Sequence, residues 1–411
     1  MTEMEKMGAR AKNAASVLAV AGKKKKTALL AIADALVSNK ERIIEKNNID
    51  IKNGEESGLT QSLLDRLRLT DERIDGMAQG VRKVADFDDP VGQVITGRTA
   101  ENGMEIKKIR VPMGVIGIIF EARPNVTSDA AALCLMAGNA VILRGGKEAI
   151  NSNTVIADVM REAIETAGLP ADCIQLVKDT TRQTSVELMC LSEYLDVLIP
   201  RGGAGLIKAV VENSKVPVIE TGAGICHLYV DKDADLNKAL TIAVNAKIQR
   251  PSVCNAIETI LVHKDVADKF LPELKKAFEK VEIKGDDATC QIIGCEHVTD
   301  DSYATEYDDY IVNIRVVDSV EEAINHIYTY STKHSESIIT ENDETAALFM
   351  NSLDSACVYH NASTRFSDGG EFGFGAELGI STQKLHARGP LGLKEMCSYQ
   401  YKIEGNGQIR E

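Results

Sequence analysis

The sequence predicts an α/β protein of two lobes with a small antiparallel β arm, and three observations support this. The chain has 411 residues, whereas single hydrophobic cores stop growing at roughly 250–300 residues. From Gly114 onward, apolar strand-like runs alternate with helical segments in two successive series, as is typical of parallel sheets covered by helices. A hairpin signal at Asn102 and Gly103 and an alternating C-terminal segment lie outside both series.

The composition is that of a globular chain with an aliphatic core. Hydrophobic residues make up 44% and charged residues 26%; with no Trp and 4% aromatics, the core has to consist of Ala, Val, Ile, Leu and Met. The net charge, 47 − 61 = −14, argues against a broad nucleic-acid-binding face. The one basic run, Lys23 to Lys26, is expected to be the solvated start of an amphipathic helix.

No segment has the features of a membrane span or a secretory signal. No apolar run reaches the ~18–20 residues of a span, and no basic start precedes an apolar stretch and a cleavage site. The nine cysteines are scattered and odd in number, which favours reduced thiols over a disulfide framework. We therefore expect a cytoplasmic protein, with one thiol as a candidate for chemistry.

The region before Pro90 is expected to be helical, because its apolar residues recur three and four apart. A loop is expected to interrupt the helices at 47–58, where the sequence reads NNIDIKNGEESG. Pro90 ends the helical region, since its ring restricts the residue before it. Two β-compatible runs then flank Asn102 and Gly103, and Asn-Gly is the strongest short hairpin signal.

The first α/β series begins at 115. A helix after its first strand is expected to be capped by Thr127 or Ser128 and to end at Gly138. The strands of this series are expected at 115–120, 140–144, 174–177, 196–200 and 216–220, and its other helices at 151–168, 182–192 and 204–213.

A second α/β series follows Glu220. Its strands are expected at 227–231, 256–262, 311–318 and 335–342, and its helices at 234–249, 264–283 and 319–327. The last segment, 394–405, alternates like a strand and could pair with the Asn-Gly hairpin.

Several strong motifs are absent from the sequence, namely those of P-loop ATPases, zincins and standard Rossmann dinucleotide sites. Cys290, Cys295 and His297 are close enough in sequence to suggest a metal cluster, but a fourth ligand with suitable spacing is lacking. The alternative is that the two cysteines are buried small hydrophobic side chains. We predict no metal site.

Two glycine-rich turns each follow a strand and precede a helix. RGGKEA at 144–149 and RGGAG at 201–205 could present backbone N–H groups to an anion, or they could be plain tight turns. Both follow strands of one parallel sheet, and open sheets bind ligands at the carboxyl ends of their strands, so the pair favours anion binding.

Cys254 lies between a helix that Pro251 ends and a buried strand. Such a loop can expose a thiol and lower its pKa through N–H dipoles and Arg250, which would make Cys254 a nucleophile; the alternative is an inert buried cysteine. Glu220 stands where a strand meets the loop TGAG, a poor position for a merely solvated carboxylate.

Four stretches together resemble the aldehyde dehydrogenase superfamily, and most closely its reductase branch that acts on an acyl phosphate. They read VPMGVIGIIFEARPNVTSDAAALCLMAGNAVILRGGKEA, VPVIETGAGICHLYVD, QRPSVCNAIETILVH and FGFGAELGISTQKLHARGPLGLKE. The resemblance implies an aldehyde-dehydrogenase-like fold of two Rossmann-like α/β lobes plus a small β oligomerisation arm. It implies a dinucleotide-binding domain at 1–94 and 113–224, a catalytic domain at 225–390, and the arm at 95–112 and 391–411.

The resemblance assigns roles to individual residues. The family's nucleophile falls on Cys254, its oxyanion-hole amide on Asn125, and the general base of hydrolytic members on Glu220. A structural role stays open for Glu220, because an acyl-phosphate reductase has no thioester hydrolysis to assist. The implied cofactor-binding residues are Arg144, Gly145, Gly146, Lys147, Gly202, Gly203 and Glu306, and the implied substrate-binding residues are Arg123, Arg250 and Ser252, which could equally form structural salt bridges or caps. Glu306 is a weak match, because the motif around it lacks Phe-Gly-Pro.

The implied cofactor is NADPH. Arg144 matches the lysine that holds the adenosine ribose in general members, and Lys147 stands where NAD-preferring members carry a glutamate. A carboxylate would repel a ribose 2′-phosphate, whereas these two cations would attract it.

The implied activity is the NADPH-dependent reduction of L-glutamyl 5-phosphate to L-glutamate 5-semialdehyde, with phosphate release, through a Cys254 thioester, as a step of proline biosynthesis. One alternative is an oxidative aldehyde dehydrogenase acting on another semialdehyde, and another is a nucleotide-binding protein without activity. The chain begins directly at the reductase region, so a separate glutamate kinase is the implied upstream partner, with transient contact as a hypothesis. The arm implies a homo-oligomer, and neither nucleic acid nor membrane is an expected partner.

Overall fold

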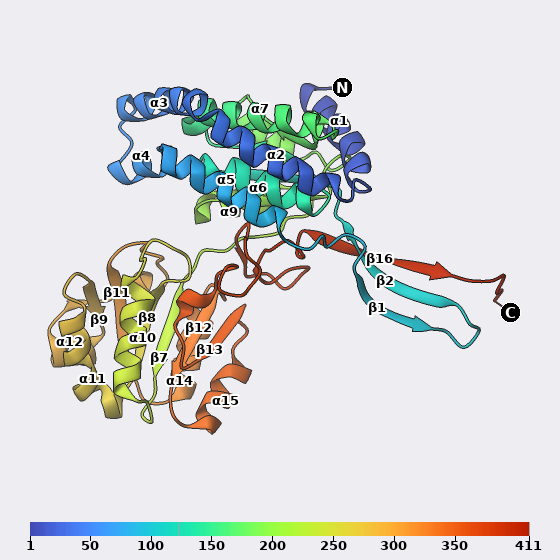
Figure 1. Ribbon diagram of the computed structural model, residues 1–411. Helices are drawn as coiled ribbons and strands as arrows, with labels where there is room; N and C mark the ends of the chain where they lie inside the picture. Colours follow the sequence, from blue (N-terminus) through green and yellow to red (C-terminus); the bar gives the residue numbers. More distant parts are fainter. Residues whose placement is uncertain (122, 411) are drawn as a thin grey trace. The chain divides into compact units, whose positions relative to one another are not determined.

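The computed structural model describes residues 1–121 and 123–410. The chain divides into two compact units (Figure 1). The first comprises Met1–Glu220, Phe374–Gly379 and Leu391–Glu411, and the second comprises Thr221–Gly373 and Ile380–Pro390. The first unit therefore contains most of the residues expected in a dinucleotide-binding domain together with those expected in an arm.

The N-terminal region is helical, as predicted. Its helices are α1 (Glu3–Leu18), α2 (Lys24–Ser38), α3 (Lys40–Glu56), α4 (Gln61–Leu67) and α5 (Asp71–Ala85). Thr2, Thr60 and Thr70 cap α1, α4 and α5 through side-chain oxygens that accept backbone N–H groups of the first turn.

The basic run at the start of α2 is not uniformly solvated, contrary to the prediction. Lys25 is buried, and its Nζ lies 2.7 Å from Asp89 Oδ1 and donates to the carbonyl of Met136 at 3.1 Å. A buried ammonium requires such partners, and both come from segments distant in sequence.

The prediction of a loop at 47–58 is wrong, because α3 runs through most of this segment. Asn47 and Asp50 are buried there and bond to residues distant in sequence. Asn47 Nδ2 donates to Ser152 Oγ at 3.0 Å. Asp50 accepts hydrogen bonds from the backbone and side chain of both Asn151 and Ser152, at 2.5–3.2 Å. Polar residues that usually favour loops are thus held in a helix by tertiary contacts.

The sheet of the first unit has four parallel strands in the order β5–β4–β3–β6. These strands are β3 (Val115–Phe120), β4 (Ala140–Arg144), β5 (Ile174–Leu176) and β6 (Val197–Arg201). The intervening helices are α6 (Asn125–Met136), α7 (Ile150–Thr166), α8 (Arg182–Met189) and α9 (Ala204–Asn213), with short 3-10 turns at Lys147–Ala149 and Ala171–Cys173.

Two details of this region differ from the prediction. The expected strand at 216–220 is only an isolated bridge between Leu198 and Val218. Helix α6 begins at Asn125, after Pro124, rather than behind a cap at Thr127 or Ser128. The ring of Pro124 fixes its φ at a value suited to a helix start.

The second unit has a parallel sheet of seven strands in the order β10–β9–β11–β8–β7–β12–β13. The strands are β7 (Cys226–Val230), β8 (Ile257–His263), β9 (Glu282–Gly285), β10 (Glu296–His297), β11 (Ile311–Val317), β12 (Ser335–Ile339) and β13 (Cys357–His360). The helices are α10 (Leu236–Ile248), α11 (Lys264–Ala277), α12 (Asp287–Ile293), α13 (Asp300–Tyr303), α14 (Val320–Tyr330) and α15 (Asp343–Ser352), and a 3-10 turn lies at Thr364–Phe366.

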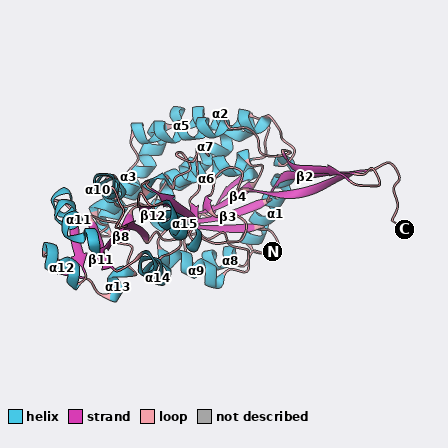
Figure 2. Ribbon diagram, turned by 90° about the horizontal axis from the view of Figure 1, so that it is seen from below, coloured by secondary structure: helices cyan, strands magenta, loops and turns pink. Residues whose placement is uncertain are grey.

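Helices cover both faces of this sheet, as the apolar strands predicted, and Figure 2 shows α10 and α14 on opposite sides of β8. Successive side chains of a strand point to opposite faces. Leu228 and Val230 of β7 therefore pack with Phe270 of α11, in a cluster that includes α10. Tyr229 points the other way and stacks on Phe349 of α15, with 6.2 Å between ring centroids.

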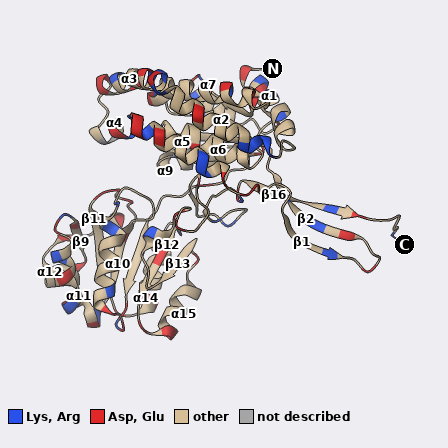
Figure 3. Cartoon of the chain, in the orientation of Figure 1, with Lys and Arg blue, Asp and Glu red and all other residues tan. Residues whose placement is uncertain are grey.

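The predicted hairpin and its third strand are confirmed. β1 (Val94–Thr99), β2 (Glu105–Pro112) and β16 (Cys397–Glu404) form an antiparallel sheet in the order β1–β2–β16. These strands extend from the rest of the first unit and carry residues of both charges (Figure 3). Lys107, for example, lies 3.0 Å from Glu105 and 3.9 Å from Glu404. A two-stranded ladder joins β14 (Ile380–Ser381) to β15 (Gly389–Pro390) in the second unit.

All nine cysteines lie among the described residues and are thiols. The sulfurs of Cys290 and Cys295 are 2.8 Å apart, but within 1–121 and 123–410 no group of three His, Cys, Asp or Glu side chains is arranged to hold a metal ion. In the same ranges, no helix is long and apolar enough to cross a membrane.

We expect Asp50→Ala to lower the free energy of unfolding by about 3 kcal/mol, because it leaves buried N–H and hydroxyl donors of Asn151 and Ser152 without their acceptor. Urea denaturation followed by circular dichroism measures this. Asp34→Ala is the matched control, since Asp34 forms an exposed ion pair with Arg82, and it should change the same quantity by at most about 1 kcal/mol. Equal effects of the two substitutions would contradict this account of α3.

Candidate active site

Cys254 lies in the loop 249–256, which joins α10 to β8, and this confirms the predicted position between a helix and a strand. The side chain is half-buried. Helix α10 ends at Ile248 with Gln249 as its C-cap, and Pro251 follows within the turn. Arg250 and Ser252, the expected substrate contacts, belong to the same loop; Arg250 is exposed and Ser252 is half-buried.

A buried ion pair closes the base of this loop. Lys247, near the end of α10, and Glu258, at the start of β8, are almost fully buried, and Lys247 Nζ lies 2.8 Å from Glu258 Oε2. Burial raises the pKa of Glu258, and the charge and hydrogen bond of Lys247 oppose that rise and favour the carboxylate. Separating the pair would leave a buried charge without a partner, which is costly. The pair therefore holds the two ends of the loop together.

The backbone of Cys254 packs directly against Gly224. A Cβ built on Gly224 would lie 1.5 Å from the carbonyl oxygen of Cys254 and 2.6 Å from its Cα. The same carbonyl accepts the S–H of Cys226 at 3.2 Å. The N–H of Gly224 donates to Glu306 Oε1 at 2.8 Å, and burial raises the pKa of Glu306. The backbone of the TGAG loop, residues 221–224, thus packs against the loop of Cys254 and supports it.

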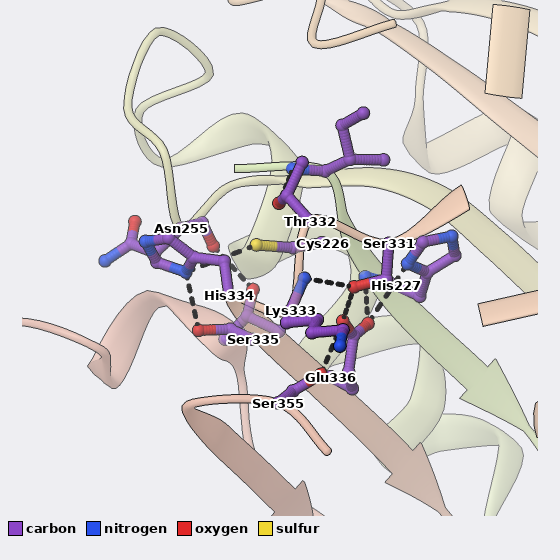
Figure 4. Close-up of polar contacts among 12 residues, drawn as sticks. Cys226, His227, Asn255, Ser331, Thr332, Lys333, His334, Ser335, Glu336 and Ser355 are labelled. Atoms are coloured by element: carbon purple, nitrogen blue, oxygen red, sulfur yellow. Dashed lines mark hydrogen bonds and ion pairs between the residues drawn. The ribbon is translucent and has the colours of Figure 1, made fainter. Parts of the chain in front are cut away.

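A second thiol, Cys226, links this support to a buried polar chain (Figure 4). Burial raises the pKa of Cys226 well above its usual range, so its sulfur stays a donor. His334 Nδ1 lies 3.6 Å from the sulfur and 2.9 Å from Ser335 Oγ, which in turn contacts Ser367 Oγ at 2.5 Å. Burial lowers the pKa of His334 to about 4, so the imidazole is neutral at neutral pH.

A buried carboxylate ties β7 to β12 beneath this chain. Glu336 accepts from the backbone N–H of His227 at 3.0 Å, and its Oε2 lies 3.0 Å from His227 Nδ1. Its other oxygen accepts from Ser355 at 3.1 Å and from Ser331, as Figure 4 shows. The predicted apolar strands thus contain a buried polar network, which sequence periodicity alone did not indicate, although Nε2 of His227 and Nε2 of His334 have no hydrogen-bond partner among the described residues.

In the first unit, Asn125 is the first residue of α6. Its Nδ2 donates to Asp129 Oδ2 at 2.9 Å, one helical turn away. Burial raises the pKa of Asp129 to about 6, opposed by the hydrogen bonds from Asn125 and Ser128. The carboxylate fixes the orientation of the amide. Asn125 and Asp129 are four residues apart in the sequence, and side chains at this spacing meet on one face of a helix, so the sequence could have indicated this pair.

The first glycine-rich turn lies at the carboxyl end of β4, with Gly145 and Gly146 buried and Lys147 exposed. Arg144 Nη2 donates to the carbonyl of Thr180 at 2.7 Å. Burial lowers the pKa of Arg144, and its Nε is a buried donor without a partner among the described residues.

The second turn differs, because its backbone already binds a carboxylate. The N–H of Gly203 donates to Glu121 Oε2 at 3.0 Å, and a Cβ on Gly202 would lie 2.6 Å from the carboxyl carbon of Glu121. Glu121 follows β3 and Gly203 follows β6, so the two neighbouring strands are joined where they end. An anion would have to displace this carboxylate.

The remaining predicted residues are placed as follows. Arg123 is exposed just before α6, and its N–H donates to the carbonyl of Glu121 at 2.6 Å. Glu220 is half-buried at the end of the first unit, after Ile219. The expected residues thus divide between units: Cys254, Arg250, Ser252 and Glu306 in the second, and Asn125, Arg123, Glu220 and both glycine turns in the first.

We expect Gly224→Ala to displace the loop of Cys254, because the added methyl group overlaps its carbonyl. The alkylation rate of Cys254 by iodoacetamide, followed by mass spectrometry of its peptide, should change at least about tenfold. Gly205→Ala is the control, since a Cβ there has open space, and it should leave that rate unchanged. A wild-type rate in Gly224→Ala would show that this contact does not position the thiol.

Comparisons with known proteins identify the family of the chain. Residues 2–295 match the model of the aldehyde dehydrogenase family. The gamma-glutamyl phosphate reductase of Clostridium novyi is 58% identical over 94% of this chain and 93% of that protein. That of Moorella thermoacetica is 55% identical over 100% of this chain and 99% of that protein.

A solved structure is also similar over the full length. The crystal structure of gamma-glutamyl phosphate reductase from Thermotoga maritima has 46% sequence identity, covers 100% of both chains and gives a TM-score of 0.98. The aldehyde-dehydrogenase-like α/β fold expected from the sequence is therefore confirmed. The chain belongs to the aldehyde dehydrogenase family and, within it, to the gamma-glutamyl phosphate reductases.

Proposed function

We propose that the chain reduces L-glutamyl 5-phosphate to L-glutamate 5-semialdehyde with NADPH, through a thioester on Cys254, in proline biosynthesis. The observation that supports this proposal most directly is the structural environment of Cys254. Its thiol is half-buried in a loop that the Lys247–Glu258 ion pair closes and that Gly224 supports. A nucleophile needs such a fixed position, because small displacements from the attack geometry cost large factors in rate.

In the first step, the Cys254 thiolate forms a C–S bond to the acyl carbon. The C–O bond to phosphate breaks, and phosphate leaves with the bonding electrons. The side-chain amide of Asn125, oriented by Asp129, donates to the oxyanion that develops. One such donor is worth roughly 3–4 kcal/mol of transition-state stabilisation.

In the second step, the thioester is reduced and the C–S bond breaks. When bound, the nicotinamide cofactor supplies the hydride. Asn125 again stabilises the oxygen anion, and Cys254 leaves as the thiolate, ready for another turnover. No water is consumed, so Glu220 is not needed as the base of a hydrolysis.

The residues of the first glycine turn fit a phosphorylated dinucleotide. Arg144 has a buried Nε that lacks a partner among the described residues, and Lys147 is exposed beside it. Arg144 is the last residue of β4 and Lys147 follows it, at the carboxyl end of a parallel strand, where such folds bind nucleotides. These two cations would hold the ribose 2′-phosphate. We assign no phosphate to Gly203, because Glu121 takes its N–H.

The proposal extends to the organisation of the chain. Residues 1–94 and 113–224 would form the dinucleotide-binding domain, residues 225–390 the catalytic domain, and residues 95–112 and 391–411 the arm of a homo-oligomer. Arg123, Arg250 and Ser252 would contact the substrate and Glu306 the cofactor. A cytoplasmic location and transient contact with a glutamate kinase complete the proposal, since an acyl phosphate is labile.

We expect Cys254→Ala to abolish NADP⁺ reduction with glutamate 5-semialdehyde and phosphate, because the proposed thioester forms on the sulfur that this substitution removes. Absorbance at the NADPH band measures this. Cys190→Ala removes an exposed thiol of the first unit and should keep the wild-type rate. Omitting phosphate should also stop the wild-type reaction. Turnover without phosphate would favour the oxidative aldehyde dehydrogenase instead.

We expect Lys147→Glu to lower kcat/KM for NADP⁺ about tenfold or more while changing that for NAD⁺ far less, since a carboxylate repels the 2′-phosphate. Initial rates over a range of each cofactor give both constants. Lys208→Glu makes the same charge change on the exposed surface of α9 and should leave the ratio unchanged. An unaltered ratio in Lys147→Glu would remove this residue from the cofactor site.

A further inference from the structure

The segment 364–367 forms a second set of hydrogen bonds to the loop of Cys254, separate from the contacts of the TGAG loop. Thr364 Oγ1 donates to the carbonyl of Asn255 at 2.6 Å. The side-chain amide of Asn255 donates to the carbonyls of Arg365 at 3.3 Å and Ser367 at 3.0 Å. Asn255 is almost fully buried, so its hydrogen bonds have no competition from water.

The side chain of Arg365 spans the loop. Its Nε donates to Gln249 Oε1 at 2.8 Å, and its Nη1 donates to Asn255 Oδ1. Gln249 is the residue after α10, and Asn255 directly follows Cys254. The planar guanidinium is suited to such a double contact, and it holds the two ends of the loop that carries the thiol.

The charge of Arg365 also acts on the loop. Burial, followed by the neighbouring Arg250, lowers the pKa of Arg365, while Cys254 and Asp368 act in the opposite direction. The interaction is reciprocal. If the thiolate of Cys254 stabilises the charged form of Arg365, then the charge of Arg365 stabilises the thiolate by the same amount. A positive charge beside Cys254 therefore favours its ionised form.

Two neighbouring side chains, Cys226 and His334, do not supply this charge. Cys226 stays protonated and His334 stays neutral. Arg250 is positive but exposed, so solvent and salt screen it. Three carboxyl groups, Glu336, Glu258 and Glu306, oppose ionisation of the neighbouring Cys226, and Asp368 acts on Arg365. Arg365, in contrast, is half-buried and held by two hydrogen bonds, so its charge is fixed in position at this loop.

We propose that Arg365 is a positioning residue for Cys254, whose guanidinium closes the nucleophile loop and favours the thiolate over the thiol. The proposal deepens the function proposed above and rests on Cys254 as its nucleophile. No motif in the sequence indicated Arg365, which stands in the loop STRFSDGG, distant from Cys254 along the chain.

Titration of the Cys254 thiol tests the proposal without substrate or cofactor. The iodoacetamide alkylation rate of the Cys254 peptide is measured by mass spectrometry between about pH 6 and 10. Arg365→Gln keeps a hydrogen-bond donor but loses the charge, and we expect its rate at neutral pH to fall about tenfold, as a one-unit rise in the thiol pKa requires. Arg365→Lys keeps the charge and should stay within about threefold of wild type.

Two controls make the outcome decisive. Arg315→Ala removes a guanidinium that pairs with Glu322 in the same unit and should leave the titration unchanged. Arg365→Met, which removes both charge and hydrogen bonds, should shift the titration in the same direction as Arg365→Gln and replaces it if that variant does not fold. Wild-type titrations in Arg365→Gln and Arg365→Met would overturn the proposal. Retained turnover in Cys254→Ala would instead overturn the proposed function, whatever Arg365 does.

Discussion

The contact between the backbones of Gly224 and Cys254 is the constraint on which the candidate site depends. It leaves no room for a side chain at position 224. The TGAG loop and the loop of Cys254 therefore pack backbone against backbone, and neither can move without the other. The strands that follow these loops, β7 and β8, are neighbours in the sheet. The parallel arrangement thus places two loops side by side, and glycine lets them touch.

The polar groups beneath the loop make this arrangement rigid. Buried ionic groups are expensive unless every one has partners. Lys247 and Glu258 pair with each other, and Glu336 is surrounded by donors from His227 and two serines. These directional contacts link α10 to β8 and β7 to β12, in addition to the apolar packing of the same elements.

Local patterns predicted much of the fold, and tertiary contacts explain where they failed. The alternation of apolar runs predicted both parallel sheets, and Asn102 with Gly103 predicted the hairpin, because each signal is local. The helical state of 47–58 depends on hydrogen bonds from Asp50 to α7, about a hundred residues later, and no local pattern contains them. In the candidate site, Cys254 was identified from its loop, whereas Glu121 and Arg365 act on residues distant along the chain, and only the folded structure reveals their partners.

The discontinuous first unit has a consequence for the order in which the protein can form. Strand β16 completes the sheet with β2, and Arg110 bonds to the carbonyl of Lys394, which is 284 residues further along the chain. During synthesis on the ribosome, the β1–β2 hairpin therefore emerges long before its third strand, and until then the edge of β2 that pairs with β16 stays open. The second unit has to be translated in that interval, so the sheet of the N-terminal unit can be completed only after the second unit has been made.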